Sequence, residues 1–176
     1  MSATFTSTLF YLAAFIAVAA TLLTITRSNA AHALLYLVVS LLAIAVIFYM
    51  LGAPLAGALE VIVYAGAIMV LFVFVIMMLN AGHNTAEQEK QWLSATAWKG
   101  PALLCTLLLL QLLTLLTQGD KALVDSHISA KQVGILLYGP YLLAVELASM
   151  LLLAGLVGAY HLGRDNRSVP DVEESP

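Results

Sequence analysis

The feature that most constrains this chain is one long apolar stretch, from Leu55 to Leu79, that contains a single acid. The stretch reads LAGALEVIVYAGAIMVLFVFVIMML. It is long enough to cross a bilayer as a helix, which takes about 20 apolar residues. Glu60 lies inside it, and an acid in hydrocarbon is costly enough to mark a functional site by default. Gly66 lies near its middle, where a glycine allows a membrane helix to deform locally.

The whole chain has the composition of an integral membrane protein. It is 62% hydrophobic and 10% charged, with a mean hydropathy of +0.98, whereas a soluble domain is about half apolar and a quarter charged. No basic stripe favours nucleic acid. Cys105 is the only cysteine, and no two of the four histidines are four residues apart. The sequence therefore predicts no catalytic, cofactor-binding or metal site in this chain.

Hydropathy predicts an all-α integral membrane protein with five transmembrane helices. The predicted spans are residues 5–25, 30–51, 55–79, 100–117 and 140–161. They form a single membrane domain, residues 1–164, which is followed by a polar tail, residues 165–176. No positively charged segment precedes the first span, which argues against a cleaved signal peptide. The short apolar run from Val133 to Tyr138 is expected at the membrane interface rather than across the membrane.

Lysine and arginine residues set the expected orientation. With the N-terminus outside and the C-terminus in the cytoplasm, five of the seven basic residues fall inside, namely Arg27, Lys90, Lys99, Arg164 and Arg167, while Lys121 and Lys131 fall outside. This excess favours that orientation. The connecting loops are too short to hold a catalytic domain, so we expect the function to lie within the membrane or with partner subunits.

Two acids, Glu60 and Glu146, lie inside the predicted spans, and no span contains a lysine or arginine. Each acid is therefore expected to be protonated, as desolvation favours, or to meet water or another subunit. Both lie about 8–9 Å inside the outer boundary, so they could form one polar layer. On an α-helical wheel, Glu60 shares its side with small residues and Tyr64, while Met69 and Val73 lie opposite. This predicts that Glu60 faces protein or water and that Met69 faces lipid or an apolar partner.

The turn formed by Tyr64, Ala65 and Gly66 has two interpretations. A π-bulge of one residue there would rotate every later side chain by about 100° around the helix axis. Switching the bulge on and off would exchange bulky and small side chains at one interface, and so open or close a water path. The alternative is that the glycine simply allows close packing, because glycine is common in membrane helices.

The fifth span places Glu146 on one side and small residues on the other. The small residues are Ala144, Ala148, Gly155 and Ala159. Membrane helices turn both kinds of face toward protein, which suggests a subunit wedged between neighbours. Glu146 is compatible with a proton path, and also with a protonated acid that hydrogen-bonds to Ser149 or to a backbone carbonyl.

Three blocks of this sequence resemble one known family. They are HALLYLVVSLLAI, ALEVIVYAGAIMVLFVFVIMMLN and LYGPYLLAVELASMLLLAGLVGAYHLGR. Together with the five spans, they make the chain similar to subunit J of bacterial NADH-quinone oxidoreductase, respiratory complex I, whose mitochondrial counterpart is subunit six. The resemblance extends from Phe10 to Arg164.

The resemblance implies a membrane-arm subunit of a proton-translocating complex in the bacterial inner membrane, which is not catalytic by itself. It implies subunits A, K and N as partners in the bilayer, and it implies flavin, iron–sulfur clusters and quinone in partner subunits. It also implies that the third helix alternates between α-helical and π-bulged forms at Tyr64, Ala65 and Gly66, and so gates water toward the acids of subunit K. Mitochondrial members lack the acid at the Glu60 position, which argues against an obligatory proton carrier there.

Two other functions are compatible with the residues. One is a subunit of a multisubunit cation/proton antiporter, whose components share ancestry with this membrane arm. The other is a purely structural spacer. Flavin and iron–sulfur clusters that co-purify with the intact complex would argue against the antiporter. Substitutions in the third span that change activity without changing assembly would argue against the spacer.

Overall fold

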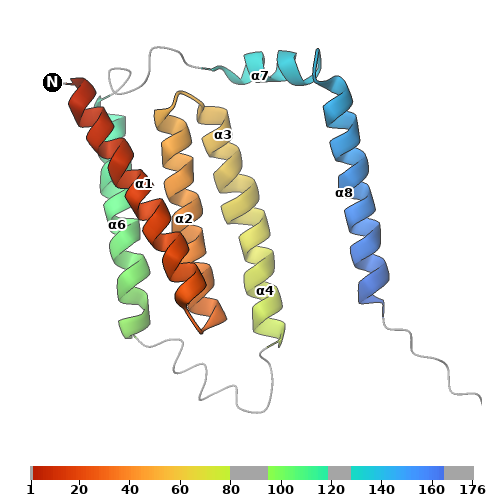
Figure 1. Cartoon of the computed structure of the whole chain (residues 1–176), viewed down its shortest axis with the longest axis horizontal. Helices are drawn as coiled ribbons and strands as arrows, with labels where there is room; N and C mark the ends of the chain where they lie inside the picture. Colours follow the sequence, from red (N-terminus) through yellow and green to blue (C-terminus); the bar gives the residue numbers. More distant parts are fainter. Residues whose placement is uncertain (1, 80–94, 119–127, 165–176) are drawn as a thin grey trace, which may run out of the picture. The chain divides into compact units, whose positions relative to one another are not determined.

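Long apolar helices dominate the computed structural model, which describes residues 2–79, 95–118 and 128–164 (Figure 1). The helices are α1 (Ser2–Thr26), α2 (Ala30–Met50), α3 (Pro54–Leu59), η1 (Glu60–Ile68), α4 (Met69–Leu79), α6 (Ala95–Gln118), α7 (Ala130–Leu137) and α8 (Leu142–Gly163). Five stretches are long and apolar enough to span a membrane: Thr4–Thr26, Ala30–Met50, Pro54–Leu79, Trp98–Thr117 and Leu142–Gly163. These stretches confirm the prediction of an all-α membrane protein with five spans.

The fifth span begins at Leu142, two residues later than predicted, because turns occupy residues 138–141. In these turns the Tyr141 N–H donates to the Leu136 carbonyl at 3.1 Å, and the Leu142 N–H donates to the Gly139 carbonyl at 3.2 Å. The apolar run before the turns forms a separate helix, α7. Its expected place at the membrane interface stays a prediction.

The chain forms two compact units, Met1–Ser129 and Ala130–Pro176. In the first unit, α2 lies at the centre and packs against α1, α3, η1, α4 and α6. In the second unit, α7 contacts α8, and no residue of α8 is buried. The single membrane domain expected from the sequence stays a prediction.

Small side chains allow α1 and α2 to pack closely. Ala13, Ala20 and Ala43 are each 0% exposed, and Ile16 and Val39 are the largest fully buried side chains. Close approach of this kind is how membrane helices associate, because lipid tails are as apolar as leucine and burial alone gives little driving force. A polar contact adds to the packing, since the hydroxyl oxygens of Thr21 and Ser40 lie 2.7 Å apart.

The turns that join the first three spans are short and well capped. The Asn29 side-chain oxygen accepts a hydrogen bond from the Ala31 N–H at 3.0 Å, which caps the start of α2. Gly52 has a φ of 79°, a left-handed conformation that favours glycine. Pro54 opens α3, where its missing N–H costs nothing. The second and third spans therefore form the tight antiparallel hairpin that their short connection requires.

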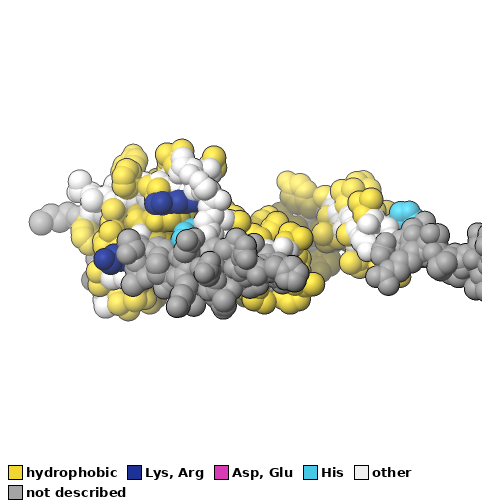
Figure 2. Space-filling view, turned by 90° about the horizontal axis from the view of Figure 1, so that it is seen from below, with side chains coloured by type: hydrophobic (Ala, Val, Ile, Leu, Met, Phe, Trp, Pro, Cys, Tyr) yellow, Lys and Arg dark blue, Asp and Glu magenta, His cyan; other side chains and the backbone are white. Residues whose placement is uncertain are grey.

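The described lysine and arginine residues of the first unit, Arg27 and Lys99, lie at the ends of spans. The Arg27 guanidinium lies 5.5 Å from the centroid of the buried Tyr36 ring. Figure 2 shows few Lys, Arg and His side chains among described side chains that are mainly hydrophobic. This distribution suits a protein that presents apolar side chains to lipid and keeps its charges near the interface.

Candidate functional site in the third span

The third span is not a regular α-helix. It begins as α3, continues as the π-helix η1 from Glu60 to Ile68, and ends as α4. Figure 1 shows the three parts as one continuous ribbon. At the end of η1 the Met69 N–H donates to the Tyr64 carbonyl, a bond to the fifth residue back instead of the fourth. Helices of this type are rare, occur mostly as single-turn bulges and cluster at functional sites.

The predicted deformable turn lies inside this π-helix. Tyr64, Ala65 and Gly66 all belong to η1, and the Tyr64 side chain is 52% exposed. An ideal Cβ built on Gly66 would lie 3.1 Å from the carbonyl oxygen of Val61, five residues earlier. That oxygen is part of the backbone, so it can give way only if the helix deforms. A regular α-helix pairs each residue with the fourth one back, so this close approach belongs to the π form.

The π-helix also decides which side of α4 faces the rest of the first unit. Gly57 is buried before η1, and Met69 is the one buried residue of α4, with 3% of its surface exposed. On a regular α-helix these two residues would point about 120° apart, and one extra residue in the intervening turn reduces the angle to about 20°. The α-helical wheel predicted that Met69 faces lipid or an apolar partner, and its burial in the first unit excludes lipid and agrees with an apolar partner.

The two intramembrane acids have different surroundings. Glu60 is partly buried at the start of η1, and Glu146 is exposed on α8. Within the described ranges, neither carboxylate has a hydrogen bond or an ion pair. The Ser149 hydroxyl donates instead to the Glu146 backbone carbonyl, at 2.7 Å. The acids belong to different compact units, so a shared polar layer and a proton path through them stay predictions.

One buried polar residue, Gln111, was missed in the sequence analysis. It is 2% exposed, and its Nε2 donates to the Leu9 carbonyl at 2.7 Å, which ties α6 to α1. Its signal in the sequence is a single amide within a run of leucines, a position where a membrane helix needs a protein partner. No group of three histidine, cysteine or acidic side chains that could hold a metal occurs among the described residues.

Comparison with known proteins gives one consistent family. A model of NADH-ubiquinone/plastoquinone oxidoreductase chain 6 matches residues 19–162. NADH-quinone oxidoreductase subunit J of Pseudomonas aeruginosa is 62% identical over 159 residues, which cover 89% of this chain and 96% of the relative. The protein of the same description from Escherichia coli K12 is 59% identical over 160 residues, which cover 90% of this chain and 87% of the relative. A subunit J from Buchnera aphidicola is 52% identical over 159 residues, 90% of this chain and 98% of the relative.

Proposed function

Because the chain belongs to the NADH-ubiquinone/plastoquinone oxidoreductase chain 6 family, we propose that it couples quinone reduction to proton translocation by changing the helical form of its third span. The chain is a subunit of the membrane arm of NADH-quinone oxidoreductase, complex I. The observation that carries the proposal is η1, a nine-residue π-helix between two α-helical halves of one span. A helix with an extra residue in one turn has a second form available, in which that turn is α-helical.

The two forms would differ mainly in the orientation of α4. α3 is held against α2, since a Cβ at Gly57 would lie 2.8 Å from the Ala45 carbonyl oxygen. If η1 became α-helical while α3 stayed in place, α4 would rotate by about 100° for each extra residue removed. Met69 would then leave its buried position, and other side chains would face α2. Such an exchange would open or close a water path beside the helix.

The proposed membrane, orientation and partner subunits of this chain follow from its family and from the distribution of its lysine and arginine residues. We place the subunit in the bacterial inner membrane, with a periplasmic N-terminus and a cytoplasmic C-terminus, as the distribution of lysine and arginine favours. Subunits A, K and N are the proposed partners. Flavin, iron–sulfur clusters and quinone are assigned to partner subunits, and this chain is not expected to be catalytic alone. Tyr64, Ala65 and Gly66 are the proposed hinge, and Glu60 and Glu146 are secondary candidates for a proton path.

Two alternatives make different predictions. Family membership argues against an antiporter subunit, because the relatives are named as parts of NADH-quinone oxidoreductase. A purely structural spacer predicts that the third span keeps one form throughout turnover. Measuring the orientation of α4 at rest and during turnover separates this alternative from the proposal.

A cysteine introduced at Ile76 reports the orientation of α4. Ile76 is partly buried and lies seven residues after Met69, on the same side of the helix. In a Cys105→Ser background, we expect maleimide labelling of Ile76→Cys in the assembled complex to change several-fold when NADH and quinone are added, because the side chain rotates by about 100°. Mass spectrometry of this subunit measures the labelling. Leu103→Cys, at a position of α6 that is 64% exposed and lies outside the rotating helix, is the reference for reagent access. The same Ile76→Cys labelling at rest and in turnover would rule out the rotation.

Replacing Glu60 with glutamine is expected to have a small effect. The side chain keeps its shape, and in the described part of the chain its carboxylate has no polar partner to lose. We expect quinone-linked turnover and the number of protons moved per NADH to stay within about threefold of the parent, a free-energy change below about 1 kcal/mol. Glu146→Gln, measured in parallel, shows whether the second acid behaves alike. Loss of proton translocation in an assembled Glu60→Gln complex would make Glu60 an obligatory proton carrier.

A further inference from the structure

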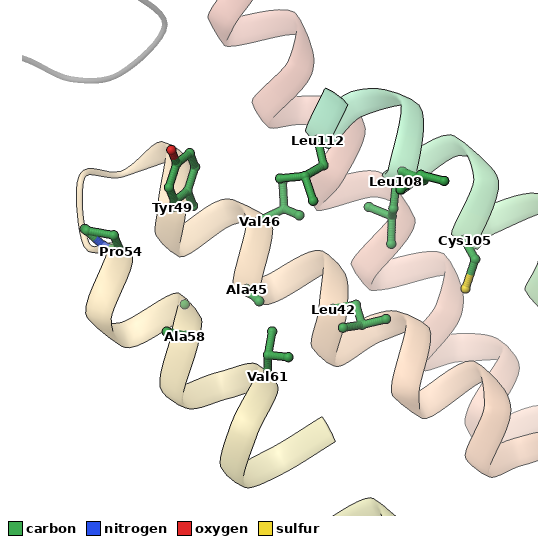
Figure 3. Close-up of a pocket in the computed structure, with 12 residues that line it drawn as sticks. Leu42, Ala45, Val46, Tyr49, Pro54, Ala58, Val61, Cys105, Leu108 and Leu112 are labelled. Carbon is green, nitrogen blue, oxygen red and sulfur yellow. The ribbon is translucent and has the colours of Figure 1, made fainter. Parts of the chain in front are cut away.

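The first unit contains a groove between three helices (Figure 3). Its walls come from Leu42 to Tyr49 of α2, from Pro54 to Val61 of α3 and η1, and from Cys105 to Leu112 of α6. Each wall contributes the first, fourth, fifth and eighth residue of its stretch, which is one face of a helix over two turns. The groove has a volume of about 460 Å³, a size typical of pockets that hold small ligands.

Small residues keep this groove open. Ala45, Gly57 and Ala58 contribute no more than a methyl group each. At Gly57 the backbone of α3 lies so close to α2 that a Cβ would meet the Ala45 carbonyl oxygen at 2.8 Å. The rim is open, since Val61 is 42% exposed and Leu109 is 55% exposed. Because these helices span a membrane, the opening faces hydrocarbon or a neighbouring helix.

The length of the groove distinguishes between these two occupants. Seven residue steps along each wall measure about 10 Å at 1.5 Å per residue. A spanning helix needs a face that continues across the hydrocarbon core, which is about 30 Å thick, whereas a lipid tail occupies half of that thickness. The groove therefore fits a lipid tail better than a helix.

The groove also has one polar end. Tyr49 is next to the last residue of α2, and Figure 3 shows it with Pro54 at the end of the groove beside the α2–α3 turn. Among the described residues, nothing hydrogen-bonds to the Tyr49 hydroxyl. Tyrosine at the end of a span lies at the level of the lipid headgroups, with its ring in the apolar layer and its hydroxyl in the polar one. An occupant with an apolar tail and a polar head matches a groove that has apolar walls and a hydroxyl group at one end.

We propose that this groove binds one acyl chain of a phospholipid, with the ester or headgroup beside the Tyr49 hydroxyl. The tail then runs along α2 from Tyr49 toward Leu42 and contacts the apolar walls on α3, η1 and α6. The lipid fills a gap that the small residues Ala45 and Ala58 leave between helices of the same subunit. This site is independent of the proposed change in helical form, and a fixed third span would leave it intact.

Photo-labelling of the assembled complex tests this site. The complex is placed in nanodiscs of phosphatidylethanolamine and phosphatidylglycerol, with a small share of phosphatidylcholine that carries a diazirine in one acyl chain. We expect adducts in this subunit to concentrate on Leu42–Tyr49 and Cys105–Leu112. Ala58→Leu should lower this labelling at least about fivefold, because leucine fills the space of the tail. Ala154→Leu, the same change at an exposed position of α8, should leave the labelling unchanged.

Leu109→Phe, at the exposed rim, repeats the test if Ala58→Leu prevents assembly, and it should also lower the labelling. Adducts spread evenly over every exposed face, or unaffected by both groove variants, would overturn the site. Loss of the adducts on adding decylubiquinone would assign the groove to quinone. Cys105 is the only cysteine of the chain, so a benzophenone can be attached there. A cross-link from this benzophenone to another subunit would show that a protein helix occupies the groove. Either of these last two results would also overturn the proposal.

Discussion

Replacing Gly66 with isoleucine is expected to lower quinone-linked turnover by at least about fivefold while the complex stays assembled. A Cβ at this position meets the Val61 carbonyl oxygen at 3.1 Å in the π-helix, and a β-branched side chain is stiff and crowded at that point. Overpacking of this kind costs about 1–3 kcal/mol, which shifts the balance between the two proposed helical forms about fivefold to 150-fold. The variant should therefore hold the third span in its α-helical form.

In the Gly66→Ile variant, the transfer of electrons from NADH into the complex should be unaffected. Oxidation of NADH by an artificial acceptor should keep its parental rate, since that reaction does not use the membrane arm. Gly158→Ile is the matched control, because nothing lies within 4 Å of a Cβ built on Gly158 in α8. Gly66→Ala should have an intermediate effect. Parental quinone-linked turnover in an assembled Gly66→Ile complex would remove Gly66 from the mechanism.

Replacing Met69 with alanine is expected to be the most destabilising change in α4. Met69 is 3% exposed, and it is the only buried residue of a helix that packs on α2. Truncation of a buried methionine to alanine costs about 2–5 kcal/mol through lost contacts and the cavity left behind. Because Met69 is turned inward by η1, the loss should also weaken the π form relative to the α-helical one. The temperature of half-inactivation of quinone-linked turnover measures the effect.

Met77→Ala provides the comparison for this prediction. It makes the same chemical change in the same helix at a side chain that is 60% exposed, and we expect little shift in the inactivation temperature. The rate of NADH oxidation by the artificial acceptor serves as a reference, since that reaction depends only on the part of the complex outside the membrane. Equal shifts for the two variants would mean that Met69 does not hold α4 in place.

Much of the architecture of this chain is a local property of its sequence. Whether a segment crosses a membrane depends on about 20 consecutive residues, so hydropathy alone predicted the five spans. The unusual residues of the third span were equally visible, because Glu60 and Gly66 stand out in a run of aliphatic side chains. The start of the fifth span was missed by two residues, since the turn at residues 138–141 depends on hydrogen bonds back to α7 and not on hydropathy.

The arrangement of side chains around the third span was decided only by the tertiary structure. A helical wheel assumes 3.6 residues per turn, and η1 breaks this assumption, so Met69 lies on the buried side instead of the opposite one. The groove also depends on the packing of three helices, so no single segment of the sequence predicts it. Residues 55–79 by themselves determine that this stretch is long and apolar enough to be a membrane helix, and they leave two interpretations of the turn at Tyr64, Ala65 and Gly66. The direction in which its second half faces depends on that turn and on its packing against α2, because each added residue rotates everything after it.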